Sequence, residues 1–245
     1  MATYDVFARY YDALTTNVDY GARAAYFNSL IKEYIGEQCM LLDLACGTGR
    51  LSVEMAKLGH VAIGVDASPE MLSVAMQRAY EAGVDILFLN QAMTSLDLYG
   101  DIDVALCVLD SLNHLPDVKA LDRTAERVAL FLRPGGLFIF DLNTPYKHRE
   151  VLADNCYVYE TGEVYCVWQN ETRGDATRIT LDFFVPAGTG YNRYTEQFDE
   201  RAFEDEAVRE VMERAGLEVL AIYDEDSRRP PRSNSERLIY LTRKV

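Results

Sequence analysis

Two aspartates and two glycines stand at the ends of two apolar runs, where a ligand could bind. Asp43 lies near the end of the run 39–45, and Gly47 and Gly49 follow it in a turn. Because glycine has no Cβ atom, a ligand can come close to the backbone of such a turn. Asp66 ends the next apolar run, 17 residues after Gly49, where its carboxylate could accept hydrogen bonds from both hydroxyls of a ribose. The carboxylate of Asp43 could face a cationic group in the same crevice.

A dinucleotide-binding loop, whose pattern is GxGxxG, is an alternative for the same segment. The position of the third glycine holds Ser52, and Arg50 directly follows Gly49. Without that glycine, close packing of the helix on the strand is harder to achieve. The chain also has no recognisable Tyr–Lys or Cys–His catalytic set, which disfavours an NAD-dependent oxidoreductase. The carboxylate of Asp43 favours a ligand with positive groups over a pyrophosphate.

The elements that position these residues alternate between strands and helices. Apolar runs that predict strands buried on both faces occur at residues 39–45, 61–66, 85–90, 103–110 and 137–143. Helical patterns separate most of them, and one begins with Ser68 as its cap and Pro69 as its first residue. Strands that are apolar on both faces belong to a parallel sheet covered by helices on each side. The sequence therefore predicts an α/β doubly wound fold.

Residues 153–203 have a different periodicity. In the string RITLDFFVP, apolar residues alternate with others, which predicts a strand with one buried face. Similar segments lie at 157–169 and 191–203, so three strand segments suggest an antiparallel sheet. A helix and two closing strands then resume the first pattern. We therefore expect residues 1–152 and 204–245 to form one domain, interrupted at 153–203 by a small inserted antiparallel β-sheet.

The composition limits the partners and the compartment. With 39 acidic and 24 basic residues, the formal net charge is −15, which repels phosphate backbones and makes nucleic acid a poor candidate substrate. The N-terminus lacks the basic and apolar regions of a signal peptide, and no apolar run approaches the length of a membrane span. Five cysteines without a CxxC pair indicate reduced thiols in a cytoplasmic protein. The three histidines lie far apart and predict no metal site.

Two motifs carry a resemblance to a known family. LLDLACGTGR (41–50) resembles the first motif of the class I S-adenosylmethionine (SAM) dependent methyltransferases, and VAIGVDASPEML (61–72) resembles the second. The likeness extends over nearly the whole chain and implies a Rossmann-like seven-stranded sheet whose last strand is antiparallel. It also implies SAM as the cofactor, bound by Tyr11, Tyr20, Asp43, Ala45, Cys46, Gly47, Gly49, Arg50, Asp66, Ala67, Met71, Gln91, Ala92, Met93, Leu109 and Asp110.

The resemblance assigns parts of the cofactor to some of these residues. In the family the glycine loop packs under the methionine moiety, and the acid that ends the second strand binds the ribose, a role that falls to Asp66. Met71 matches a position that often packs on the adenine, although it could equally be a core residue. The family usually has an acid after the third strand that accepts a hydrogen bond from the adenine amino group. Ala92 stands there in this chain, and Gln91 or a backbone carbonyl could accept instead.

The segment LCVLDSLNHL (106–115) resembles a bacterial subgroup with small-molecule or unknown substrates. This resemblance implies methyl transfer to a small-molecule acceptor by in-line displacement, in which positioning can supply about 7–11 kcal/mol. Candidate general bases are Asp110, His114 and Glu196, although His114 and Glu196 could also be solvated side chains. The aromatic-rich insertion could be a substrate lid or a dimer contact. A noncatalytic SAM- or nucleotide-binding regulatory module is the alternative, and the sequence leaves the acceptor and the oligomeric state open.

Overall fold

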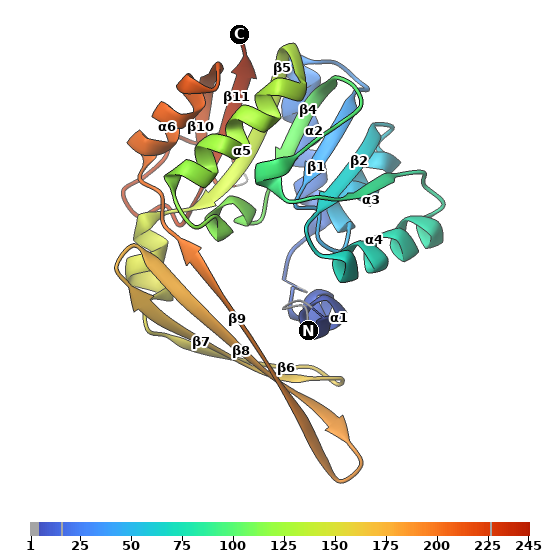
Figure 1. Cartoon of the computed structure of the whole chain (residues 1–245), viewed down its shortest axis with the longest axis vertical. Coiled ribbons are helices and arrows are strands. Elements are labelled where there is room, and N and C mark those ends of the chain that lie inside the picture. The colour runs from blue at the N-terminus through green and yellow to red at the C-terminus, as the bar shows by residue number, and fades with distance from the viewer. Residues whose placement is uncertain (1–4, 16, 226) are drawn as a thin grey trace.

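The computed structural model describes residues 5–15, 17–225 and 227–245, and its main body is a seven-stranded mixed sheet (Figure 1). The strands lie in the order β3-β2-β1-β4-β5-β11-β10. Their bounds are β1 (Met40–Leu44), β2 (Val61–Asp66), β3 (Leu87–Asn90), β4 (Ile102–Cys107), β5 (Leu132–Asn143), β10 (Leu217–Asp224) and β11 (Arg237–Lys244). Neighbours from β3 to β5 are parallel, whereas β11 runs antiparallel to both β5 and β10. The predicted doubly wound sheet with an antiparallel last strand is confirmed.

Helices cover both faces of this sheet (Figure 1). Their bounds are α1 (Asp5–Leu14), α2 (Tyr20–Tyr34), α3 (Arg50–Lys57), α4 (Pro69–Ala82), α5 (Val118–Phe131) and α6 (Asp205–Arg214). Residues of α2 and α3 pack on one face, with α4 against α3, and residues of α5 and α6 pack on the other. The α4 helix begins as the sequence predicts, because the Ser68 side chain accepts a hydrogen bond from the N–H of Met71 and Pro69 follows it. Burial on both faces explains why the central strands are mostly apolar.

The chain between β5 and α6 forms a separate antiparallel sheet in the order β6-β7-β8-β9. Its strands are β6 (Cys156–Glu160), β7 (Tyr165–Arg173), β8 (Ala176–Ala187) and β9 (Gly190–Arg201). Figure 1 shows this sheet below the carboxyl ends of the parallel strands, with the β8–β9 hairpin reaching furthest from the main body. The expectation of three strand segments is wrong by one, because residues 157–169 contain a turn. The N–H of Thr161 donates to the carbonyl of Val164 at 2.9 Å and closes a β6–β7 hairpin that alternation alone does not mark.

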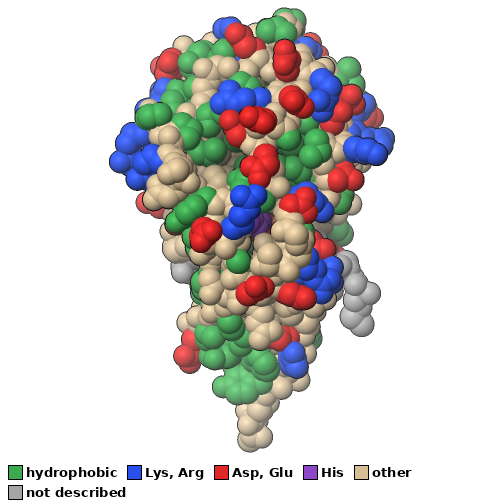
Figure 2. All heavy atoms as spheres, turned by 90° about the vertical axis from the view of Figure 1, so that its left-hand side faces the viewer, with side chains coloured by type: hydrophobic (Ala, Val, Ile, Leu, Met, Phe, Trp, Pro, Cys, Tyr) green, Lys and Arg blue, Asp and Glu red, His purple; other side chains and the backbone are tan. Residues whose placement is uncertain are grey.

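The two faces of the inserted sheet differ in burial. Ile179, Leu181 and Phe183, which alternation along β8 assigns to one face, are fully buried. Tyr10 of α1 stacks on Phe183 with the ring centroids 6.4 Å apart, so the N-terminal helix joins this core. Hydrophobic side chains also gather on the outside, in the lower part of the view in Figure 2. Exposed apolar residues of the inserted sheet include Val158, Tyr165 and Tyr191.

The cysteines do not cross-link the chain. All five are free thiols, and Cys156 is the exposed one. Within the described ranges, no helix is long and apolar enough to span a membrane. Because all five cysteines are free, the contacts that hold the inserted sheet against the main fold include no disulfide.

Candidate active site

The carboxyl ends of β1, β2 and β4 meet at one edge of the main sheet. Beyond two of these ends, Ala45 (φ 60°), Leu109 (φ 60°) and Asp110 (φ 54°) adopt the left-handed conformation that residues other than glycine rarely occupy. Each such residue costs about 1–3 kcal/mol and persists only where surrounding contacts hold it. Strain of this kind concentrates at binding sites, so it marks this edge as a candidate.

Two adjoining cavities open here, with volumes of about 250 and 40 Å³. They are chambers of one site, because both are lined by Tyr11, Ala45, Gly47, Leu109 and Ser111. The larger chamber is also lined by Asp66, Ala67, Met71, Gln91, Ala92 and Met93. The smaller chamber is also lined by Tyr20, Asp43, Cys46 and Arg50. Of the cofactor residues expected from the sequence, Gly49 and Asp110 are the ones that line neither chamber.

Backbone N–H groups hold the carboxylate of Asp66, which lines the larger chamber. Its Oδ2 accepts the N–H of Gly47 at 2.8 Å, and its Oδ1 accepts the N–H of Ser68 at 2.8 Å. Burial raises the pKa of Asp66, although backbone hydrogen bonds, first that of Ser68 and then that of Gly47, oppose the rise. Each carboxylate oxygen has a further lone pair, so the group can still accept two hydrogen bonds from a vicinal diol such as that of a ribose.

The two glycines of the turn have different roles. Gly47 has φ 54°, and a Cβ built on it meets no atom within 4 Å, so its side of the turn is open to a ligand. Gly49 has φ 73°, and a Cβ there would lie 2.8 Å from the Cβ of Ala75 in α4. The packing of the turn against α4 therefore requires Gly49. The expectation that both glycines admit a ligand needs this correction.

Asp43 lines the smaller chamber, although it is only 2% exposed. The hydroxyl of Ser52 donates a hydrogen bond to its Oδ2. Burial raises the pKa of Asp43 to about 6; the Ser52 hydrogen bond opposes this rise, and the charge of Asp66 adds to it. A cationic ligand group in the chamber would compensate this buried charge. Ser52, which replaces the third glycine of a dinucleotide-binding loop, thus orients Asp43.

Two tyrosines from the N-terminal helices border the smaller chamber. Tyr11 of α1 and Tyr20 of α2 are hydrogen-bonded to each other through their side chains. The guanidinium of Arg50 lies over the Tyr20 ring, 4.3 Å from its centroid, as in a cation–π contact. Burial raises the pKa of both tyrosines, so their hydroxyls remain protonated at neutral pH. This end of the site presents hydrogen-bond donors and a cation, which suit a ligand carboxylate.

The far end of the larger chamber lies between α4 and the segment after β3. Met71 is buried and lines it together with Ala92 and Met93. The Gln91 amide is engaged elsewhere, because its Nε2 donates to the carbonyl of Asp97 at 2.9 Å and its Oε1 accepts the N–H of Asp97 at 2.8 Å. This geometry favours the backbone over the Gln91 side chain as the contact to an adenine.

Asp110 forms an ion pair instead of lining the chambers. The Nη2 of Arg237, in β11, donates to its Oδ1 at 2.7 Å. Burial alone would raise the pKa of Asp110, but the charges of Arg237 and Lys147 and the hydrogen bond from Arg237 lower it to about 2. An ionised, engaged carboxylate is suited to holding the turn after β4 and poorly suited to taking up a proton.

The same turn is supported by Asp141, a fully buried residue of β5. The N–H of Leu109 donates to its Oδ2 at 2.9 Å and the N–H of Asp110 donates to its Oδ1 at 2.6 Å. Arg23 and Arg237 donate to the same carboxylate at 3.2 and 2.9 Å. Sequence reasoning missed Asp141, although an aspartate inside the apolar string LFIFDLN was a visible signal.

The inserted sheet contacts the site at His114. This residue belongs to the main fold and ends a short 3₁₀ helix, η2 (Ser111–His114). His114 lines the larger chamber, and its ring centroid lies 5.0 Å from that of Phe198 in β9. Burial lowers the pKa of His114, although the charges of Asp110 and Asp66 oppose the change, so the imidazole is neutral at pH 7. Glu196 shares the face of β9 that holds Phe198 and is buried, but it lines neither chamber.

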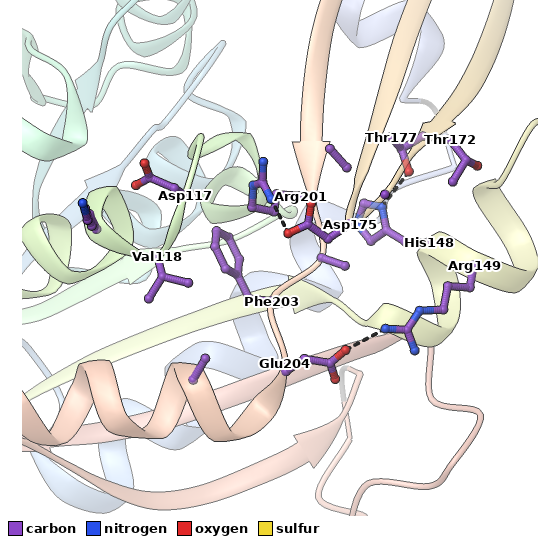
Figure 3. Close-up of a pocket in the computed structure, with 15 residues that line it drawn as sticks. Asp117, Val118, His148, Arg149, Thr172, Asp175, Thr177, Arg201, Phe203 and Glu204 are labelled. Atoms are coloured by element: carbon purple, nitrogen blue, oxygen red, sulfur yellow. Dashed lines mark hydrogen bonds and ion pairs between the residues drawn. The ribbon is translucent and has the colours of Figure 1, made fainter.

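A third cavity, of about 440 Å³, lies where the inserted sheet joins the main fold (Figure 3). It shares no lining residue with the two chambers and contains none of the expected cofactor residues. Its walls carry three polar pairs, which are His148 with Thr177, Arg149 with Glu204, and Arg201 with Asp175. This cavity therefore belongs to the junction between the sheets and not to the cofactor site.

Comparison with known proteins identifies the family. Residues 41–136 match the family described as methyltransferase domain. The chain is 31% identical to "Putative methyltransferase YqeM" of Bacillus subtilis, over 98% of this chain and 97% of that protein. A solved S-adenosylmethionine-dependent methyltransferase from Clostridium acetobutylicum is 31% identical, with a TM-score of 0.89 and 99% of both chains covered. The sugar N-methyltransferase KedS8 of Streptoalloteichus sp., 23% identical, shares the fold with a TM-score of 0.81 over 100% of this chain and 94% of that one.

The chain belongs to the class I SAM-dependent methyltransferases, and SAM is its cofactor. The chambers fit this molecule. Asp66 offers the acceptors that a ribose needs, and Asp43 offers a buried charge that a cation would compensate. Arg50 offers a counterion for a carboxylate. A SAM molecule carries all three of these groups.

Proposed function

We propose that the chain transfers a methyl group from SAM to a small-molecule acceptor, and that residues 153–203 form a lid over this acceptor. The observation that carries the proposal is the contact between His114 and Phe198, whose ring centroids are 5.0 Å apart. It joins a residue of the larger chamber to the inserted sheet, so an acceptor beside the cofactor would lie under that sheet. Residues 1–152 and 204–245 would then form the SAM-binding domain.

The proposed cofactor contacts follow from the chemistry of the two chambers. Asp66 would accept the ribose hydroxyls, and Asp43 would compensate the cationic amino end. Arg50, whose guanidinium lies over Tyr20, would pair with the carboxylate. Met71, Ala92 and Met93, which line the larger chamber, would enclose the adenine. When bound, SAM supplies a methyl group on a positively charged sulfur, which is a good leaving group for an in-line displacement.

The chain's own residues have to align the acceptor and exclude water. In this proposal the inserted sheet supplies the apolar wall through Phe198, whose ring packs against His114 of the larger chamber, and Phe183, stacked on Tyr10, supports that face from within its core. Trp168 packs against the same cluster. Apolar and aromatic walls with a few polar groups are the usual lining of a site for a small organic ligand.

His114 is the proposed proton acceptor. It is neutral at pH 7 because burial lowers its pKa, and it lines the larger chamber. A positioned base of this kind contributes about 10²–10⁴-fold to the rate. Glu196, buried on the face of β9 that holds Phe198, is the second candidate. Asp110 would shape the methionine end indirectly, by holding the turn through Arg237.

The small-molecule assignment has support from KedS8, whose description as a sugar N-methyltransferase names a small acceptor. Its structure covers the whole of this chain, the inserted sheet included. The net charge of −15 points the same way, because an acidic surface repels nucleic acid. A small acceptor that fits beneath the inserted sheet agrees with both observations.

The test uses the full-length protein with methyl-labelled SAM and a fractionated cell extract. Label is expected in a low-molecular-weight product whose structure mass spectrometry can identify, and it should be absent with Asp66→Ala. Label only in the nucleic acid or protein fraction would overturn the small-molecule assignment. SAM binding without transfer to any fraction would favour a noncatalytic module instead.

A further inference from the structure

Glu200, near the end of β9, is a buried carboxyl group beside His114. Its side chain is 5% exposed, and its Oε1 lies 4.0 Å from the Nε2 of His114. Its Oε2 is buried and has no hydrogen-bond partner among the described residues. A buried polar atom without a hydrogen-bond partner destabilises the folded state, so the position of this carboxyl group needs an explanation.

Buried hydrogen bonds keep the two side chains opposed. Asn113, next to His114, donates from Nδ2 to the carbonyl of Arg201, next to Glu200, at 2.7 Å. The Oδ1 of Asn113 accepts the N–H of Asn143, at the end of β5, at 2.9 Å. Because Asn113 is fully buried, η2 and the end of β9 cannot separate without leaving these groups unpaired.

Charged groups from several elements surround Glu200. They are Asp110 after β4, Lys147 in the π-helical turn η3 (Lys147–Leu152), and Arg237 in β11. Burial raises the pKa of Glu200 to about 8; the charge of Asp110 adds to this rise, and Lys147, Arg237 and a hydrogen bond with Asn143 oppose it. Burial lowers the pKa of His114. At neutral pH, therefore, Glu200 is protonated and His114 is neutral.

We propose that Glu200 is a positioning residue that selects which nitrogen of His114 carries the proton. The proposal rests on the role of His114 as the base of the proposed methyl transfer. When Glu200 is protonated, it donates to Nε2, so the ring proton lies on Nδ1, which can then only donate. When Glu200 is ionised, it accepts from Nε2–H, and Nδ1 has a free lone pair. Separations longer than a hydrogen bond are common before the substrate binds and shorten afterwards.

Only the second arrangement lets His114 take a proton from the acceptor. The N–H or O–H bond of the acceptor breaks, its proton moves to Nδ1, and the electron pair left on the acceptor forms the bond to the methyl carbon. The carbon–sulfur bond breaks with its electrons on sulfur. The Glu200 carboxylate then stabilises the imidazolium at Nε2–H, as a carboxylate does for a catalytic histidine elsewhere. Methyl transfer should therefore rise as Glu200 ionises, at a pH of about 8.

The test is nitrogen NMR of the full-length protein labelled at its three histidines and loaded with S-adenosylhomocysteine. His114→Gln assigns the signal. In the wild type, the proton of His114 should move from Nδ1 to Nε2 as the pH rises through about 8. In Glu200→Gln this change should be absent, and in Glu200→Asp, which keeps an ionisable group, it should return with a shifted midpoint. Glu204→Gln, an exposed glutamate close by in the chain, is the matched control and should behave as the wild type.

An unchanged tautomer of His114 through this pH range in the wild type would overturn the proposal. So would a Glu200→Gln variant that titrates like the wild type. The NMR result does not depend on turnover, so it separates this inference from the proposed function. If His114 changes its tautomer but no methyl group is transferred, the proposed methyl transfer is refuted. If methyl transfer occurs but does not increase as the pH rises through about 8, the role of Glu200 is refuted.

Discussion

Arg237 and Asp110 are 127 residues apart in the sequence and are joined by a hydrogen bond of 2.7 Å from Nη2 to Oδ1. Both also contact Asp141, to which the Nη1 of Arg237 donates at 2.9 Å and the N–H of Asp110 donates at 2.6 Å. The last strand of the sheet thus reaches the turn after β4 through one buried ionic cluster. Leu109, in that turn, lines both chambers. Residues far outside the SAM motifs therefore fix part of the candidate cofactor site.

Asp141→Ala should destabilise the protein strongly. It leaves Arg23 and Arg237 without their shared carboxylate, and removing one partner of a buried ion pair costs about 3–5 kcal/mol. Urea unfolding measures the loss. The matched control is Glu218→Ala, which removes an exposed pair with Arg243 and should cost less than about 1 kcal/mol. Equal losses in the two variants would show that the buried cluster does not stabilise the fold more than an exposed ion pair does.

Asp66→Ala should weaken SAM binding. The carboxylate is oriented by the N–H groups of Gly47 and Ser68 and offers its remaining lone pairs to the ribose. Losing charge-assisted hydrogen bonds should cost about 1.5–3 kcal/mol of binding free energy, measurable by isothermal titration calorimetry. Asp85→Ala, an exposed aspartate before β3, serves as the control. An Asp66→Ala variant with wild-type affinity for SAM would remove the ribose assignment.

Asp43→Asn should make the SAM-free protein more stable at neutral pH and its binding of SAM weaker. The folded-state pKa, about 6, is higher than that of an unfolded aspartate, about 3.9. The stability contributed by the protonated form is therefore complete below about pH 4 and is lost as the pH rises through 6. Asparagine cannot ionise and still accepts the Ser52 hydrogen bond, so the gain in unfolding free energy should approach 3 kcal/mol, to order of magnitude.

The check is urea unfolding of both proteins below and above the pKa of Asp43. The wild type should lose stability between these conditions relative to Asp43→Asn, and calorimetry should show lower SAM affinity for the variant. If the variant is no more stable than the wild type at neutral pH, Asp43 does not carry an uncompensated buried charge in the SAM-free protein.

The candidate cofactor site could be located from the sequence, as residues that line two adjoining chambers, because its signals are local. Asp43, Gly47 and Asp66 lie within one strand–turn–helix–strand unit, where strand ends and a glycine turn fix the geometry over a short stretch of chain. The cap at Ser68 and the proline after it likewise set the start of α4 from adjacent residues. The alternation in β8 was sufficient to identify its buried face.

Other features depend on contacts between distant segments and leave no local pattern. Asp141 acts through Arg23 and Arg237, and Glu200 through His114, across separations that periodicity does not encode. The requirement for Gly49 comes from Ala75 on a neighbouring helix. Asp110 lies where the sequence predicts a pocket residue, but Arg237 on the last strand takes up its carboxylate.

Replacing the inserted sheet with a short Gly/Ser linker should preserve SAM binding and abolish methyl transfer. The linker should end before Phe203, since this residue belongs to the core of the main sheet. Both cofactor chambers are lined by residues outside the insertion, so SAM affinity should stay within about tenfold, or about 1.4 kcal/mol. The acceptor would lose the wall that Phe198 forms against His114.

Because the replacement also exposes Tyr10, a point variant keeps this prediction testable if the shortened chain does not fold. Phe198→Ala should impair transfer to the labelled product and leave SAM affinity unchanged. Tyr191→Ala, at a residue that is 67% exposed on the same strand, should change neither the transfer nor the SAM affinity.

The rival interpretation makes the inserted sheet a dimer contact. Sedimentation would then show a change of mass in the shortened protein, which would remain active. Retained transfer with an unchanged acceptor preference would refute the lid, because a lid that contacts the acceptor cannot be removed without altering which acceptor reacts.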